Sequence, residues 1–311
     1  MILTTIFFAR ITQLAKNQKI LRWFFVFFVS FACFAMRPSA GAIGQSSTAP
    51  SRIISLIPAV SEMLFAIGAG AQVVAVSSFD EYPAEVRKLP RVGALLDPDL
   101  ERILSLAPDL VVVYESQTDL RRHLERASIP MVIYKHAGLA DVTTTIRLLG
   151  GRIGRDAEAN ALVTRIDAGL AGIRARVAGR PKPRTLLVFG RDALALRGIY
   201  ASGGVGFLHD MLIAAGGENV FADVKQQSVQ ATSELILARA PEVILELRAG
   251  DMTAEQRKRE EDVWRVLSSV PAVRSGRVSI INDPLTVVPG PRVAEGTELI
   301  ARLLHPDTFA Q

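Results

Sequence analysis

DLERILSLAPDLVVV, which runs from Asp99 to Val113, returns later in the chain as TSELILARAPEVILE, from Thr232 to Glu246. The aligned stretches share Glu101/Glu234, Ile103/Ile236, Leu104/Leu237, Ala107/Ala240 and Pro108/Pro241. Each stretch opens with a polar residue suited to cap a helix, and its Ala-Pro ends that helix because the residue before a proline disfavours the helical conformation. The β-branched run that follows predicts a buried parallel strand. Two copies predict two similar α/β lobes, with a ligand cleft between them.

Residues 1–42 are typical of a secretory signal peptide. Their charged residues are all basic, Trp23 to Met36 is a nearly continuous apolar run, and Ala40-Gly41-Ala42 offers small residues for cleavage. The alternative is a retained membrane anchor, although the run is shorter than the roughly 20 residues of a membrane-spanning helix. We therefore expect export to the periplasm.

Removal of this segment changes the interpretation of charge and cysteine content. The whole chain has 36 Lys and Arg against 31 Asp and Glu, and loss of the leader's basic residues leaves 31 of each sign. A near-neutral chain gives no reason to expect a nucleic-acid partner. The one cysteine, Cys33, lies within the leader, so cleavage after Ala42 excludes disulfides and thiol catalysis. Acylation of Cys33 to form a lipoprotein is the alternative, although Ser30-Phe31-Ala32 lacks the usual leucine.

The remaining chain alternates predicted strands and helices, which favours parallel sheets with right-handed crossovers. The predicted elements include strands from Met131 to Tyr134, Arg184 to Phe189 and Val278 to Ile281, and helices from Ser61 to Ile67 and Ala254 to Ser268. We expect a disordered lead-in at 43–51, an N-terminal α/β lobe at 52–140, connecting helices at 141–180, a C-terminal α/β lobe at 181–305 and a tail at 306–311. Within the connection, Asp156 to Val177 has apolar residues at helical spacing and no proline. This helix is predicted to be a strut between the lobes. The alternative is a helix that covers one lobe.

Ligands of open α/β sheets bind beyond the carboxyl ends of the strands. The loops expected there are 58–62, 77–82, 93–97 and 114–117 in the first lobe, and 190–204, 225–229, 248 and 283–292 in the second. Their aromatic and basic residues are the candidate ligand contacts: Phe79, Tyr82, Tyr114, Tyr200, Arg191, Arg197, Arg248 and Arg292.

Several segments resemble the substrate-binding proteins of bacterial ABC importers for iron-siderophores, haem and cobalamin. They are RIISLIPAVSEMLFAIGAG, SSFDEYPAEVRKLPRVG, DPDLERILSLAPDLVVV, AGGENVF and TSELILARAPEVILE. The resemblance extends over nearly all of the chain after the leader and is closest to the periplasmic cobalamin-binding branch. It implies two Rossmann-like lobes joined by a single long α-helix, a ligand held between them, and an ABC permease and ATPase complex in the inner membrane as partner. It also implies a monomer without catalytic residues.

The resemblance implies a role for the repeated glutamates. Glu101 and Glu234 match the surface glutamates that dock on permease arginines in this family, which suits bidentate contacts to carboxylates. The alternative is that each glutamate only complements the positive end of its own helix.

The same resemblance points to a metal chelate, most simply cobalamin or a related corrinoid. Phe79 matches an aromatic residue of cobalamin binders, and Asp283 matches an acidic one. Leu95 and a position near Ser228 replace tryptophans, and Val287 or Val288 occupies the place of an arginine. Ferric siderophores are the first alternative, because the arginines would suit an anionic chelate. Haem is the second, with Tyr82, Tyr200 or His209 as nominal iron ligands.

Other classes of function have less support. The sequence has no nucleophile elbow, phosphate loop or HExxH motif, and its histidines lack the spacing of a bare metal site, so no resident metal is expected. The alternatives from other classes are a periplasmic metal-handling enzyme or chaperone, and a partner-binding protein that has lost its ligand.

Overall fold

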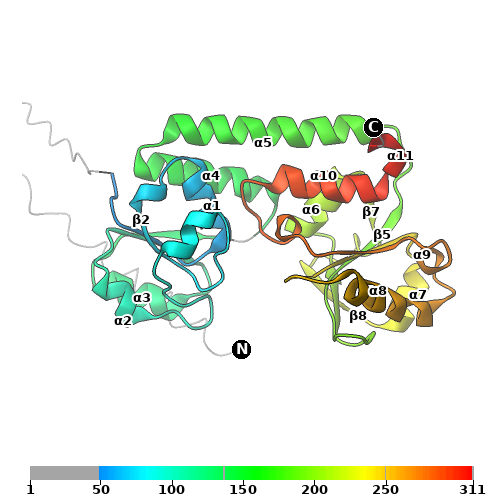
Figure 1. Cartoon of the computed structure of the whole chain (residues 1–311). Coiled ribbons are helices and arrows are strands. Elements are labelled where there is room, and N and C mark those ends of the chain that lie inside the picture. The colour runs from blue at the N-terminus through cyan, green and yellow to red at the C-terminus, as the bar shows by residue number, and fades with distance from the viewer. Residues whose placement is uncertain (1–48, 136, 249, 310–311) are drawn as a thin grey trace, which may run out of the picture. The chain divides into compact units, whose positions relative to one another are not determined.

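The computed structural model describes residues 49–135, 137–248 and 250–309, and Thr48–Gln311 forms one compact unit. The predicted signal peptide, Cys33 and most of the predicted lead-in lie outside the described residues. Two sheets organise the unit, and Figure 1 shows them with the helices that cover them. Within the described ranges, no helix combines the length and the apolar character needed to cross a membrane.

The first sheet is parallel and has the order β2-β1-β3-β4. Its strands are β1 (Ile53–Ser55), β2 (Val73–Val76), β3 (Leu110–Tyr114) and β4 (Met131–Tyr134). Between them lie α1 (Pro58–Ala66), η1 (Gly70–Gln72), η2 (Ala84–Lys88), α2 (Leu100–Ser105) and α3 (Thr118–Arg126). Helix α1 begins at Pro58 and not at Ser61 as predicted, because proline suits the first helical turn, where its missing N–H has no partner to lose.

The second sheet has the order β10-β9-β5-β6-β8, with β7 also paired to β5. Its strands are β5 (Arg184–Gly190), β6 (Ile199–Ser202), β7 (Glu218–Asn219), β8 (Ser228–Ala231), β9 (Val243–Leu247) and β10 (Val278–Ile281). Strands β6 and β8 are antiparallel to their neighbours, so the expectation of a wholly parallel second sheet is wrong. These short strands were absent from the predicted elements, because SVQA and IYAS carry little apolar pattern.

The helices around the second sheet complete this half of the unit. They are α6 (Phe207–Ala214), α7 (Ser233–Arg239), α8 (Ala254–Asp262), η3 (Val263–Leu267), α9 (Pro271–Arg274), η4 (Pro284–Thr286), α10 (Val293–Leu304) and α11 (Pro306–Phe309). The helix predicted from Ala254 to Ser268 is thus an α-helix followed by a 3₁₀ segment. Trp264, which is fully buried, lies in that segment.

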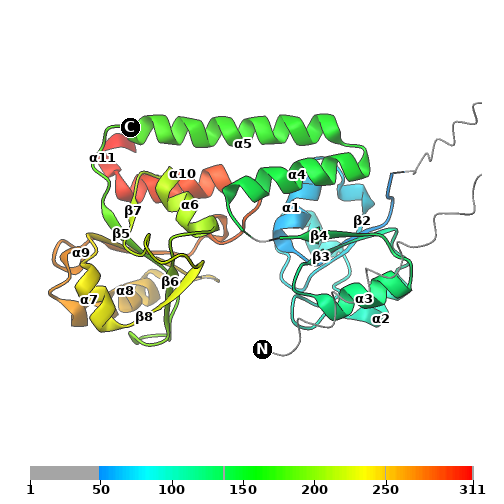
Figure 2. The same ribbon diagram turned by 180° about the vertical axis from the view of Figure 1, so that it is seen from behind.

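Helices α4 (Leu139–Ile153) and α5 (Asp156–Val177) lead from the first sheet to the second. Helix α5 has the predicted bounds and buries one stripe of apolar residues, among them Leu162, Ile166 and Ile173. It packs against α4, which follows the first sheet, and against α10 and α6 of the second half (Figures 1 and 2). A helix that contacts elements of both halves agrees with the strut interpretation.

The repeated sequence forms the same structure twice. Asp99 caps α2 by accepting a hydrogen bond from Arg102 N at 2.9 Å, and Thr232 caps α7 by accepting one from Leu235 N at 3.2 Å. Both helices lead into left-handed residues, Ala107 and Ala240, with φ of 44° and 45°. The predicted caps and the helix ends before Pro108 and Pro241 are thereby confirmed.

Tertiary hydrogen bonds extend the repeat to the strands that precede it. The backbone N–H of Arg52 donates to Asp109 Oδ1, and that of Arg184 donates to Glu242 Oε2, both at 2.8 Å. Each arginine side chain also donates to the end of the repeat helix, Arg52 to Leu106 O and Arg184 to Arg239 O, both at 2.6 Å. In both halves, the arginine at the start of the first strand is therefore hydrogen-bonded to the repeat in the same way.

Candidate functional site

The structure places four predicted site residues at or just beyond the carboxyl ends of parallel strands. Tyr114 ends β3 in the first sheet, and Arg191, Arg248 and Asp283 follow β5, β9 and β10 in the second. Because β5, β9 and β10 are parallel, the last three residues share one edge of their sheet. Ligands of open α/β sheets bind at such an edge.

An aromatic pair lies at this edge of the second sheet. Tyr200 on β6 is in register with Gly190, the last residue of β5, and its ring centroid is 6.5 Å from that of Phe189. Tyr200 is 45% exposed and Phe189 is partly exposed, so both rings offer surface to a ligand. Phe189 was not among the predicted contacts, because it was assigned to the end of the predicted strand from Arg184 to Phe189 and not to the loop that follows.

The loop after β2 presents a second aromatic surface, at Phe79. Asp80 Oδ2 accepts hydrogen bonds from Ser77 N at 3.0 Å and Ser77 Oγ at 2.5 Å, and Arg91 Nη1 donates to the carbonyls of Ser77 and Asp80. Burial raises the pKa of the Asp80 carboxyl, whereas hydrogen bonds from neighbouring serines oppose this shift. The bonded loop leaves the Phe79 ring 72% exposed. Hydrogen bonds on either side of Phe79 therefore hold the loop backbone, and the Phe79 ring remains open to solvent.

Arg292, in the second half, contacts two residues of the first half. Its Nε and Nη2 donate to Glu62 Oε2 and Oε1 at 2.9 and 2.6 Å, and its guanidinium carbon lies 3.8 Å from the ring centroid of Tyr82. Glu62 lies on α1, after β1, and is only 4% exposed. The hydrogen bonds to Glu62 raise the pKa of Arg292, although burial opposes the shift. Arg292 therefore remains charged, and this charge is neutralised by Glu62.

Glu62 is the residue of this group that was not singled out from the sequence, although it lies within the predicted loop range 58–62. The signal was available, because SEMLF places one carboxylate in a helix whose neighbouring residues are apolar and buried. A buried carboxylate needs a charged or hydrogen-bonding partner.

Arg191 and Arg248 belong to an internal charge network. Arg191 Nε and Arg248 Nε donate to Glu246 at 3.0 and 2.5 Å, and both guanidiniums also contact Glu260 Oε2, at 2.8 and 3.1 Å. The indole N–H of Trp264 donates to Glu246 Oε2 at 2.9 Å. The Arg191 side chain has no exposure to solvent, so its guanidinium supports the edge of the sheet from within and faces no open surface.

The other predicted contacts have mixed surroundings. Leu95 is exposed, and the Gln117 side chain donates to its carbonyl at 3.2 Å. Asp283 caps η4 by accepting a hydrogen bond from Leu285 N at 2.9 Å. Tyr114 meets Tyr134 edge to face at 5.9 Å, and burial raises its pKa. The exposed Arg197 lies 3.6 Å from Asp192. Among the predicted residues, the Arg292 guanidinium lies over the Tyr82 ring, and Arg248 Nη1 donates to the Arg191 carbonyl at 3.4 Å.

The two repeated glutamates are both exposed, in the first turns of α2 and α7. Hydrogen bonds from its own backbone N–H and from Thr232 lower the pKa of Glu234. Neither carboxylate forms an ion pair with another described residue. Both are therefore available to a partner.

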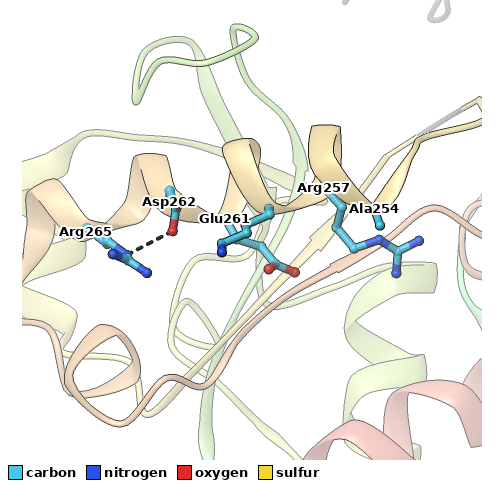
Figure 3. Close-up of a pocket in the computed structure, with 6 residues that line it drawn as sticks. Ala254, Arg257, Glu261, Asp262 and Arg265 are labelled. Atoms are coloured by element: carbon cyan, nitrogen blue, oxygen red, sulfur yellow. Dashed lines mark ion pairs between the residues drawn. The ribbon is translucent and has the colours of Figure 1, made fainter.

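Two cavities differ in whether predicted site residues line them. One of about 490 Å³ lies among Glu62, Tyr82, Arg292 and residues of α5 that include Leu162 and Arg165. The other, a hollow of about 500 Å³, runs along α8 and is lined from Ala254 to Arg265 (Figure 3). In Figure 3 its side chains all come from one helical segment, where Asp262 and Arg265 pair with each other at 2.9 Å. Only the first cavity brings together residues from both halves.

Metal ligands do not gather in the described part of the chain. No group of three or more His, Cys, Asp or Glu is placed to hold a metal ion there. His209 on α6, a nominal haem ligand, contacts Asn219 Nδ2 at 3.3 Å.

Comparison with known proteins identifies the class that this geometry represents. The periplasmic binding protein family matches residues 53–285. The ABC transporter substrate-binding lipoprotein YvrC of Bacillus subtilis (strain 168) is 31% identical over 267 residues, which cover 84% of this chain and 82% of YvrC. The vitamin B12-binding protein of Salmonella typhimurium (strain LT2) is 32% identical over 228 residues, which cover 72% and 81% of the two chains.

Solved structures agree with this fold. The periplasmic heme-binding protein RhuT from Roseiflexus sp. RS-1 matches with a TM-score of 0.71 and 25% identity, over 83% of this chain and 99% of RhuT. The periplasmic vitamin B12-binding protein BtuF of Vibrio cholerae has a TM-score of 0.71 and 22% identity, over 84% and 99% of the two chains, and shows the fold alone.

The chain belongs to the periplasmic binding protein family, whose members are substrate-binding transport proteins of ABC importers and not enzymes. The two-lobe α/β fold is the one that the sequence predicted. Membership implies a small-molecule ligand and an ABC permease and ATPase as partners.

Proposed function

We propose that this chain is an exported binding protein for a metal chelate, most simply cobalamin or a related corrinoid, which it delivers to an ABC permease. The observation that carries the proposal is the exposure of Phe79 and Tyr200 at the strand ends of the two halves, in a chain 32% identical to a vitamin B12-binding protein. A corrinoid ring is large, flat and mostly apolar, and aromatic faces are suited to cover it.

The charges of the predicted site support a neutral ligand over an anionic one. Arg191 and Arg248 share Glu246 and Glu260, and Arg292 is paired with Glu62. Each group has equal numbers of basic and acidic side chains, so none of these arginines retains an uncompensated charge. A polyanionic ferric siderophore would need such charges. Haem, the alternative that the RhuT match favours, would use Tyr82 or Tyr200 as its nominal iron ligand, since both side chains are exposed.

The identity of the ligand can be tested by binding measurements and by the visible spectrum of the purified protein. We expect the purified chain to bind cyanocobalamin stoichiometrically, with heat released in calorimetry and co-elution of the red chromophore. Haem and a ferric hydroxamate serve as competitors. Saturable binding of haem or the hydroxamate, with none of cyanocobalamin, would exclude the corrinoid assignment.

Replacement of Phe79 by alanine should weaken binding of cyanocobalamin about tenfold, because truncation removes an aromatic face worth about 1–2 kcal/mol. Calorimetry measures the change. Val266→Ala is the matched control, since Val266 is similarly exposed on η3 and far along the chain from the predicted loops. Equal affinities for Phe79→Ala and the original chain would remove Phe79 from the site.

The docking role proposed for Glu101 and Glu234 predicts a separation of two functions. Glu101→Ala with Glu234→Ala should weaken binding to the permease about tenfold or more, because two charge contacts are lost, and should leave chelate affinity unchanged. Glu125→Ala with Glu255→Ala is the control, with the same change of net charge at exposed positions in the two halves. Parallel loss of permease binding and chelate affinity would contradict the assigned role.

The proposal includes export by cleavage of residues 1–42, with lipid attachment through Cys33 as the alternative. Mass spectrometry of the N-terminus of protein from intact cells distinguishes a chain that begins near Ile43 from one that begins at acylated Cys33.

A further inference from the structure

The shared residues of the repeat divide into two groups. Ile103 and Ile236 have no exposure to solvent and anchor their helices in the core. The Ala-Pro pairs form the left-handed turn into the next strand, with Pro108 and Pro241 buried. The fold itself requires these positions.

The other shared residues face solvent in both copies. Leu104 is 41% exposed and Leu237 is 42% exposed, and each follows its glutamate by three residues. Residues three apart on a helix lie on one face, about one turn from each other. Core packing therefore does not explain why an exposed leucine stands beside an exposed glutamate in both copies.

Both repeat helices lie on one side of the compact unit. Figures 1 and 2, from opposite directions, each show α2 and α7 on the side away from α5. A partner that approaches this side would meet both helices.

We propose that Leu104 and Leu237 form, with Glu101 and Glu234, two equivalent docking elements, each a carboxylate beside an apolar anchor. The proposal rests on the permease-docking role proposed above and extends it to the apolar contact. The complementary surface of the permease would then have, at two equivalent places, a basic side chain next to an apolar depression that receives the leucine.

The two residue types contribute differently to such an interface. Charged pairs at the rim steer approach and set orientation, and salt screens them. A leucine that leaves water contributes through buried apolar area, which salt does not screen. Loss of the leucines should therefore weaken binding equally at low and moderate salt, whereas loss of the glutamates should reduce the dependence on salt.

Binding of the full mature chain to the importer's permease and ATPase complex in lipid nanodiscs tests this surface. Leu104→Ala with Leu237→Ala should raise Kd about tenfold, the size expected for two partly buried apolar contacts. Leu104→Met with Leu237→Met, which retains apolar volume, should bind almost as the original chain does. Leu148→Ala with Ile213→Ala is the control, at exposed apolar residues of α4 and α6.

The outcomes separate the two proposals. Unchanged Kd for the leucine-to-alanine pair, with weaker binding of the glutamate pair, overturns the apolar anchor and leaves the docking glutamates intact. No binding by the original chain overturns the permease partner and this surface together. A self-associating chain that becomes monomeric on leucine replacement, with Kd for the permease unchanged, assigns the surface to a second copy and also overturns the proposal.

Discussion

Replacement of Glu246 by alanine is expected to destabilise the chain by about 3–5 kcal/mol, the usual cost of removing one partner from a buried ion pair. Glu246 is fully buried on β9 and accepts hydrogen bonds from Arg191, Arg248 and Trp264. Without it, two guanidiniums share the single carboxylate of Glu260, and Arg191 has no access to water. Such a loss is a large fraction of the stability of an ordinary domain.

Urea unfolding followed by tryptophan fluorescence measures this effect. Trp264 is the only tryptophan after the predicted leader, and it donates to the removed carboxylate, so it reports on this network. Glu246→Gln keeps an acceptor for the indole but not the charge, and should also destabilise. Glu218→Ala, at an exposed position on β7, should change stability by about 0.5 kcal/mol or less. Coincident unfolding curves for Glu246→Ala and Glu218→Ala would show that the network adds no stability.

Replacement of Arg292 by alanine should cost about 2–5 kcal/mol, because it leaves the nearly buried carboxylate of Glu62 without its partner. The stacking of the guanidinium over Tyr82 is lost as well. Since Glu62 lies on α1 in the first half and Arg292 immediately precedes α10 in the second, this change also removes a contact between the two halves.

Replacement of both partners tests whether the unpaired charge causes the loss. Glu62→Met with Arg292→Met should be less destabilising than Arg292→Ala, because no unpaired charge is left in a buried place. Arg265→Ala is the surface control: Arg265 pairs with Asp262 at 2.9 Å but is largely exposed, and its loss should cost about 1 kcal/mol or less. A cost for Arg292→Ala no larger than that of Arg265→Ala would contradict the argument.

Much of the fold was predictable because the decisive interactions are local. The bounds predicted for Met131–Tyr134, Asp156–Val177 and Val278–Ile281 are those of β4, α5 and β10. Apolar periodicity, polar caps and prolines act within a few residues and leave a pattern in the sequence. Strands β6 and β8 lack such a pattern, since they depend on antiparallel pairing with distant neighbours.

The sequence was enough to place four of the predicted contacts at strand ends, but it did not predict the charges that surround them. Tyr114, Arg191, Arg248 and Asp283 do lie at the strand ends where topology places ligand sites. No local pattern indicates that the arginines are neutralised, because Arg191 lies 55 residues from Glu246 and Arg292 lies 230 residues from Glu62.

The amino-acid sequence alone is enough to specify two halves of one design, since each repeat carries its own cap, helix, turn and strand within a few residues. Which charges are satisfied internally and which face solvent depends on the tertiary structure. Ion pairs form between residues that folding brings together from distant parts of the chain. Glu62, Glu246 and Glu260 are paired in this way, while Glu101 and Glu234 face solvent beside matched leucines.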